Sequence, residues 1–242
     1  MIPWDVLARV VLLPVLLAQG RVVRRKALIL PEPEGARSGR AGTGPALKVL
    51  IVGDSSAAGV GTNTQKDALA GQVAAALAPH FSVYWRLVAE TGASTTTTHA
   101  TLKHLETERF DLAIIALGVN DVTGAVTRRR WIAEQSALHH LLQERFGVQR
   151  IYASGLPPMG LFPLLPQPLR WILGAQAARL DRALAAIAAR DEVVRHIPFN
   201  LPHEARYFAE DGYHPSPPAY ALWAGVLADL ICRDQAHGNF SH

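Results

Sequence analysis

The chain has only one cysteine, Cys232, so no disulfide can form within it. Cys232 lies in an apolar C-terminal helical pattern, which predicts a buried small residue rather than a nucleophile. Aromatic residues make up only 7% of the sequence and charged residues 18%, whereas hydrophobic residues reach 49%. A chain of 242 residues with this composition favours one sizeable α/β domain with a packed core, held together without a disulfide framework.

Motifs for metals and nucleotide cofactors are also missing. No cluster of cysteine, histidine and acidic residues supports a metal site. Gly59-Val60-Gly61 lacks the full Gly-x-Gly-x-x-Gly pattern of dinucleotide-binding loops. We therefore expect the protein to use neither a metal nor a cofactor.

The net positive charge of the chain comes from its first 45 residues. Residues 1–45 hold seven basic and three acidic residues, and seven minus three accounts for the whole net charge of +4. Residues 46–242 are therefore neutral overall, which argues against binding of nucleic acid.

The N-terminal segment joins an apolar run to a basic cluster. Val10 to Ala18 is apolar but too short to cross a hydrocarbon core of roughly 30 Å, and four basic residues follow it at positions 21–26. A secretory signal carries its charge before the apolar run instead. Two interpretations stay open: an interfacial helix that makes peripheral membrane contact through residues 3–26, or a helix packed on the protein's own surface. Membrane contact with a trailing basic cluster predicts a cytoplasmic body, and the sequence leaves export open.

A stretch rich in glycine and proline, residues 31–45, predicts a linker rather than a packed element. We therefore divide the chain into residues 1–45, an apolar and basic helix with its linker, and residues 46–242, a folded domain.

Strand and helix patterns alternate along this domain. Alternation of this kind implies right-handed crossovers and a parallel sheet covered by helices on both faces, a three-layer α/β/α sandwich. The predicted strands are Leu47–Val52, Phe81–Val88, Leu112–Leu117, Gln149–Ala153 and Val193–Ile197. The predicted helices are Lys66–Ala78, Thr95–Glu108, Arg128–Phe146, Leu169–Arg190 and residues 217–231.

Polar motifs follow several of these strands. Gly53-Asp54-Ser55-Ser56, Gly92 and Gly118-Val119-Asn120-Asp121 each come soon after a predicted strand. Ligands of such sheets bind beyond the carboxyl ends of the strands, so these motifs are expected to meet at one edge.

Together with Asp211-Gly212-Tyr213-His214, these motifs supply the groups needed for acyl transfer by a serine. A serine hydroxyl needs a base, and His214 is the candidate base for Ser55. Asp211, three residues earlier, can accept a hydrogen bond from the imidazole and fix its tautomer. The backbone N–H groups of Ser55 and Gly92 and the side-chain amide of Asn120 are candidate donors to the oxyanion.

The residues Ser55, Gly92, Asn120 and His214, in this order, resemble the SGNH hydrolase superfamily, also called GDSL-type lipases and esterases. Gly53-Asp54-Ser55-Ser56 is similar to its first motif, with Ser56 where leucine is often found. The resemblance spans about residues 47–231. It implies a flavodoxin-like fold with a five-stranded parallel sheet and a metal-free ester hydrolase. Ser55 would be the nucleophile, His214 the base and Asp211 its orienting partner, with Ser55, Gly92 and Asn120 in the oxyanion hole.

The sequence favours an ester of a short to medium acyl chain, or a lysophospholipid-like lipid, as the substrate. Met159, Leu161 and Phe162 lie in an apolar loop after the fourth predicted strand and are candidate walls of the acyl pocket. The alternatives are a carbohydrate O-deacetylase or an acyltransferase with the same triad, and a non-catalytic, membrane-tethered binding protein.

Overall fold

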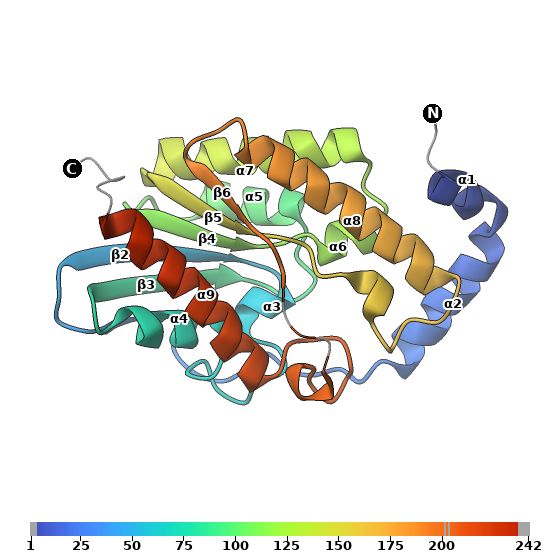
Figure 1. The fold of residues 1–242 in the computed structure, drawn as a ribbon, viewed down its shortest axis with the longest axis horizontal. Helices are drawn as coiled ribbons and strands as arrows, with labels where there is room; N and C mark the ends of the chain where they lie inside the picture. The colour runs from blue at the N-terminus through green and yellow to red at the C-terminus, as the bar shows by residue number, and fades with distance from the viewer. Residues whose placement is uncertain (1–3, 201, 203, 237–242) are drawn as a thin grey trace.

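A central sheet lies between two layers of helices in the computed structural model of the chain (Figure 1). The structure describes residues 4–200, 202 and 204–236, with side chains described from residue 7 onward. Within these residues the sheet has six strands in the order β1-β3-β2-β4-β5-β6. The strands are β1 (Ser38–Ala41), β2 (Ala46–Gly53), β3 (Ser82–Ala89), β4 (Leu112–Ala116), β5 (Arg150–Ser154) and β6 (Val194–Ile197).

Strands β2 to β6 pair in parallel, as the alternating pattern predicted. Their spatial order, β3-β2-β4-β5-β6, is the flavodoxin-like order of a doubly wound sheet. The central strand β4 is buried at every position, which explains its uninterrupted apolar sequence. The three-layer class and the five parallel strands are thus confirmed.

The prediction that residues 31–45 form only a linker is wrong for its second half. Residues 38–41 form the edge strand β1, which pairs antiparallel with β3. None of its four residues is buried, so backbone pairing rather than core packing holds it in place. The sheet therefore has six strands instead of the predicted five.

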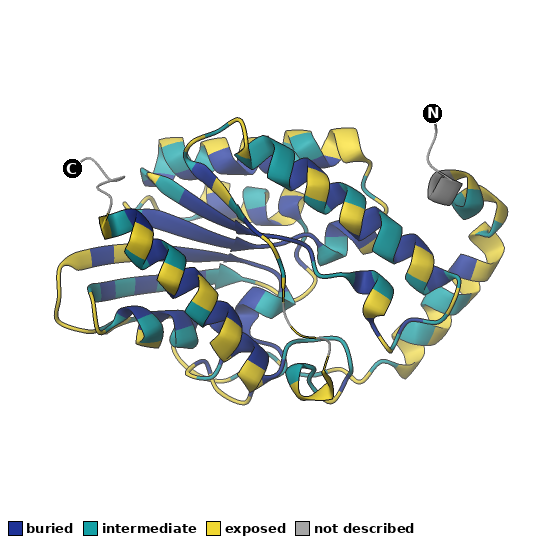
Figure 2. Cartoon of the chain, in the orientation of Figure 1, coloured by how far each residue is buried: buried dark blue, intermediate teal, exposed yellow. Residues whose placement is uncertain are grey.

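The two helical layers bury separate halves of the core. Helices α5, α7 and α8 pack on one face of the sheet, and α4 and α9 pack on the other. Figure 2 shows the buried residues concentrated in the strands and on the helix faces turned toward them. The helices of this domain are α3 (Ser55–Ala58), α4 (Leu69–Leu77), α5 (Thr95–His104), α6 (Val119–Thr123), α7 (Arg128–Phe146), η1 (Met159–Leu161), α8 (Leu169–Ala188), η2 (Ala205–Tyr207) and α9 (Pro217–Ala236).

The N-terminal segment forms two short helices, α1 (Trp4–Val11) and α2 (Leu13–Lys26), at one end of the molecule (Figure 1). Pro14 lies in the first turn of α2, where its missing N–H costs no hydrogen bond, so it begins a helix. Gln19 ties α2 to the start of α8: its amide donates to the carbonyl oxygen of Gln167 at 2.6 Å and accepts from the N–H of Leu169 at 3.1 Å. The helix therefore packs on the domain, in agreement with the interpretation of a helix packed on the protein's own surface.

The outward face of these helices is nevertheless apolar. Val10 is 73% exposed and Val11 80% exposed, and Val15 and Val22 are exposed as well (Figure 2). Among the described residues, no helix combines the length and the hydropathy that a membrane crossing requires.

Candidate active site

The carboxyl ends of three neighbouring strands are aligned where the polar motifs follow them. In the register of the sheet, Gly53 at the end of β2 lies opposite Ala89 of β3 and Ala116 of β4. Ser55, Gly92 and Asn120 follow these strand ends by two, three and four residues, respectively. The predicted convergence of the three motifs on one sheet edge thus follows from the strand register.

Ser55 is the first residue of α3, directly after β2. The carboxylate of Asp54 accepts hydrogen bonds from the backbone N–H of Ser56 at 2.9 Å and from its hydroxyl at 2.7 Å, and so caps this short helix. Burial raises the pKa of Asp54 above its ordinary value. The N–H of Ser55 lies in the first turn of α3, where N–H groups have no partner within the helix.

His214 connects Ser55 to Asp211. Its Nε2 lies 2.9 Å from the Ser55 hydroxyl oxygen, and its Nδ1 lies 2.5 Å from Oδ2 of Asp211. The other oxygen of Asp211 accepts the backbone N–H groups of Tyr213 at 2.9 Å and His214 at 3.0 Å. The structure therefore brings the three predicted residues into one chain of hydrogen bonds.

The same contacts set the charge of Asp211. Burial works against its ionisation, but the hydrogen bonds from the imidazole and from the two backbone N–H groups outweigh that effect. The pKa of Asp211 consequently lies below its ordinary value. An ionised Asp211 fixes Nδ1 of His214 as the protonated nitrogen and leaves Nε2 to accept the proton of Ser55.

Gly92 lies in the loop after β3, and Asn120 is the second residue of the short helix α6. Gly92 has a φ of +86°, which glycine adopts without strain, and a Cβ at this position would meet no atom within 4 Å. One amide N–H of Asn120 donates to the carbonyl oxygen of Ala93 at 2.9 Å, which ties α6 to the loop that carries Gly92. An amide group has two N–H donors, so a second one remains for a ligand.

Asp121, next to Asn120, connects α6 to the start of α5 through hydrogen bonds with Thr95. It is almost fully buried and accepts the N–H of Thr95 at 3.2 Å and its hydroxyl at 3.1 Å. Burial raises the pKa of Asp121 to about 6, against the hydrogen bonds from Thr95 that lower it. Asp121 thus anchors the start of α5, directly after the loop that carries Gly92.

Glu32 is a further component that sequence analysis missed, because it lies in the stretch interpreted as a linker. Its Oε1 accepts both the N–H and the hydroxyl of Thr91, each at 2.8 Å, and its Oε2 accepts Arg37 at 2.8 Å. Arg37 also donates to the carbonyl oxygen of Ala89. Although burial opposes its ionisation, these hydrogen bonds lower the pKa of Glu32. Glu32 therefore holds the residue next to Gly92 and the end of β3.

Because this contact positions the Gly92 loop, we expect Glu32→Ala to lower kcat about 10- to 100-fold while KM changes little. Glu32→Gln, which retains an acceptor for Thr91, should restore part of the loss. Glu34→Ala is the matched control, since Glu34 is exposed and two residues away. Steady-state kinetics of the three variants test this role, and an unchanged kcat in folded Glu32→Ala would contradict it.

Two cavities adjoin His214. The smaller, of about 70 Å³, is lined by Ser55, Phe162, Tyr213 and His214 among others. The larger, of about 570 Å³, is lined by Met159 and by residues of α2 and α8. Of the three predicted pocket walls, Met159 and Phe162 thus border the cavities, whereas Leu161 is 53% exposed and lines neither of them.

The ring of Phe162 packs edge-on against Tyr213, with the centroids 5.2 Å apart, and so contacts the residue that precedes His214. Among the described residues, no three histidine, cysteine or acidic side chains are grouped as metal ligands would be.

Comparison with known proteins gives a family. The family model of GDSL-like lipases and acylhydrolases matches residues 51–222. The GDSL-like esterase Rv1075c of Mycobacterium tuberculosis is 33% identical over 130 residues, which are 51% of this chain and 40% of that protein. This chain therefore matches less than half of the relative's length.

Solved structures share the fold. TesA has a TM-score of 0.61 at 18% identity and covers 76% of this chain and 97% of its own. A carbohydrate acetylesterase, Est24 of Sinorhizobium meliloti, has a TM-score of 0.57 at 18% identity. It covers 77% of this chain and 99% of its own. The matched region contains all the residues of the hydrogen-bonded chain described above, and the protein belongs to the GDSL-like lipase/acylhydrolase family.

Proposed function

We propose that this protein is a serine hydrolase of carboxylic esters, with Ser55 as nucleophile, His214 as base and Asp211 as its orienting partner. The observation that carries the proposal is the continuous chain of hydrogen bonds from Ser55 through His214 to Asp211. Membership of the GDSL-like lipase/acylhydrolase family supports the same reaction class.

In this mechanism the Ser55 oxygen attacks the ester carbonyl carbon while Nε2 of His214 takes the hydroxyl proton. The negative oxygen of the tetrahedral intermediate is stabilised by the N–H groups of Ser55 and Gly92 and by the amide of Asn120. His214 then gives its proton to the departing alcohol, which leaves an acyl-serine. Water, deprotonated by His214, attacks that acyl group and releases the acid and free Ser55.

The substrate proposed is an ester of a short to medium acyl chain or a lysophospholipid-like lipid. The apolar surfaces beside His214 support a lipid-like acyl group. A carbohydrate O-deacetylase is the second candidate, because a structural neighbour is a carbohydrate acetylesterase.

Hydrolysis of p-nitrophenyl esters from acetate to palmitate tests the reaction class. Activity that disappears in Ser55→Ala is expected, and the preferred chain length separates a deacetylase from a lipid hydrolase. An alcohol added as competing acceptor separates a hydrolase from an acyltransferase, since only a transferase would convert most of the acyl group to the new ester. No Ser55-dependent turnover of any ester would contradict the proposal and favour a non-catalytic binding role.

We also propose peripheral membrane contact through residues 3–26, with the catalytic body on the cytoplasmic side. The exposed valines of α1 and α2 support it, as do the basic residues in the last turn of α2. Sedimentation with vesicles that contain anionic lipid is expected, and Val10→Ser/Val11→Ser should weaken it. Equal sedimentation of the double variant would contradict contact through this face.

A further inference from the structure

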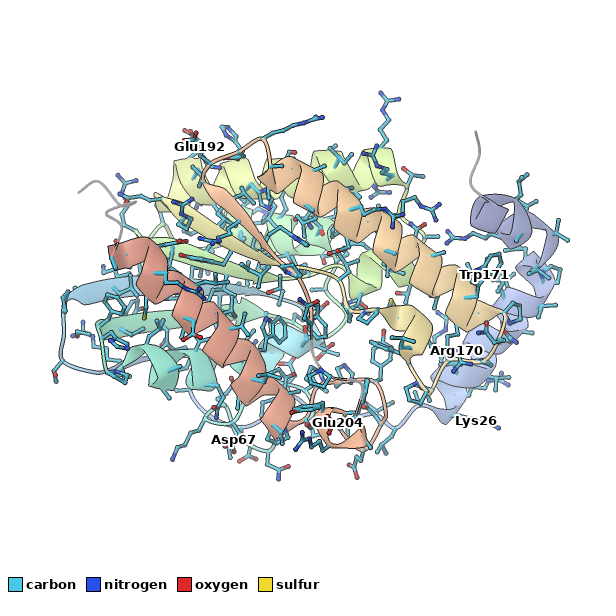
Figure 3. All side chains as sticks on the ribbon, viewed as in Figure 1. Lys26, Asp67, Arg170, Trp171, Glu192 and Glu204 are labelled. Carbon is cyan, nitrogen blue, oxygen red and sulfur yellow. The ribbon has the colours of Figure 1, made fainter. Side chains whose placement is uncertain are left out.

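The larger cavity beside His214 is a groove between the N-terminal helix and the domain. One wall is α2, and the opposite wall comes from η1, the loop after it and α8. Figure 3 shows Arg170 and Trp171 at the end of α8 that lies beside α2. The lining is mainly aliphatic, with Leu165 and Leu173 on the domain side, so an apolar ligand is favoured.

The residues of α2 that line this groove form one stripe along the helix. Leu13, Leu16, Leu17, Gly20 and Val23 follow each other at intervals of one or three residues, which places them on one face. The stripe reaches Ala27 just beyond the helix. Fourteen residues separate Leu13 from Ala27, so at about 1.5 Å per residue the wall is on the order of 20 Å long.

The valines that make the outer face of the N-terminal helices apolar do not belong to this stripe. Val10, Val15 and Val22 are exposed and are not part of the groove lining. Leu13 and Leu17 of the stripe are themselves 48% and 47% exposed, so the groove is open to solvent, and the two faces of α2 differ in whether they line the groove.

The inner end of the groove lies at the candidate active site. Asn120, Asp211, Tyr213 and His214 contribute to its lining, together with Met159. Asn120 is the proposed side-chain donor to the oxyanion and lines the same groove as Met159 and α2, so the groove begins where the ester carbonyl would be held. The smaller cavity contains Ser55 but offers only about 70 Å³.

We propose that this groove binds the acyl chain of a medium-chain ester, and that α2 is one wall of the acyl-binding site. The proposal rests on the proposed ester hydrolase and names its substrate class. A chain of about ten or more carbons has the length to contact both walls, whereas acetate ends near His214. Each methylene buried between the walls contributes about 0.8 kcal/mol of apolar transfer free energy.

Gly20→Phe tests the groove directly. Among the described residues outside the backbone of α2 itself, a Cβ at Gly20 meets one atom within 4 Å, in the Arg24 guanidinium at 3.9 Å, so the space in front of it is open for a larger side chain. Phenylalanine also has the higher helix propensity, so α2 should remain folded. Val22→Phe is the matched control, because the same ring is added to the exposed face. Leu17→Trp is a second filling variant on the groove stripe.

The readout is kcat/KM for p-nitrophenyl acetate, decanoate and laurate, each supplied as monomers below its micelle concentration. We expect Gly20→Phe and Leu17→Trp to lower kcat/KM for laurate about 10- to 100-fold. Acetate hydrolysis should be unchanged in both variants, and Val22→Phe should match the wild type on all three esters. Unchanged thermal midpoints establish that the variants are folded.

Three results would overturn the proposal while acetate hydrolysis persists. The first is a kcat/KM for laurate equal to that of the wild type in both filling variants. The second is a loss of kcat/KM for laurate in Val22→Phe as large as the loss in the filling variants. The third concerns dodecyl acetate, an ester whose long chain lies on the alcohol side. A loss of kcat/KM for dodecyl acetate but not for laurate would place the alcohol chain in the groove. Absence of acetate hydrolysis in the wild type would instead contradict the proposed function.

Discussion

Replacing Ser55 with alanine should lower kcat for ester hydrolysis about 10⁴- to 10⁶-fold, because the acyl-serine can no longer form. The hydroxyl oxygen lies 2.9 Å from Nε2 of His214 and is the only atom of this side chain that can attack a carbonyl. Burst and steady-state kinetics with p-nitrophenyl acetate measure the loss, and the burst of nitrophenol should vanish together with the turnover.

Ser56→Ala is the matched control for this change. Its hydroxyl donates to Asp54 at 2.7 Å, but the backbone N–H of the same residue retains the cap of α3. We therefore expect Ser56→Ala to keep kcat within about tenfold of the wild type, the loss expected from one side-chain hydrogen bond. Comparable losses in both variants would indicate that α3 is disturbed, and full activity in Ser55→Ala would exclude Ser55 as the nucleophile.

Asp211→Asn should lower kcat about 10⁴-fold while leaving the loop in place. The asparagine oxygen can still accept the N–H groups of Tyr213 and His214, as Oδ1 of Asp211 does at 2.9 and 3.0 Å. Its amide nitrogen, however, would face Nδ1 of His214 and force the proton onto Nε2. The imidazole then has no free nitrogen with which to deprotonate Ser55.

The pH dependence follows from the charge of Asp211. Since its pKa lies below the ordinary value, the carboxylate stays ionised through the mildly acidic range and loses its charge only at still lower pH. The acidic limb of kcat/KM near neutrality should therefore not arise from Asp211.

For the Asp211→Asn variant itself, a loss of kcat of less than about tenfold would contradict the role assigned to this residue.

Periodicity was sufficient to predict the parallel core of the fold. Leu112–Leu117 is an uninterrupted apolar run because β4 is buried at every position, and such runs are recognisable in a sequence. The edge strand β1 has no such pattern. Its four residues, Ser38 to Ala41, pair with β3 through their backbones and none is fully buried, so their composition was that of a linker.

The hydrogen-bonded chain was predictable because its members lie in short motifs with fixed spacing. Asp211 and His214 are three residues apart, and the structure gives them a direct contact of 2.5 Å. Glu32 was not predictable, because its contact with Thr91 joins residues 59 positions apart and matches no local pattern. The groove face of α2 could not be predicted either, since an apolar helix has the same sequence pattern whether it faces lipid, a core or a ligand.

Covalent labelling with a fluorophosphonate, followed by peptide mapping, tests most directly whether Ser55 is the activated nucleophile. We expect a single adduct on Ser55 that forms in step with the loss of esterase activity. Labelling should be absent in Ser55→Ala and strongly slowed in His214→Ala, because the hydroxyl then has no base. An adduct on another residue that forms as activity is lost, or undiminished labelling of Ser55→Ala, would contradict the account.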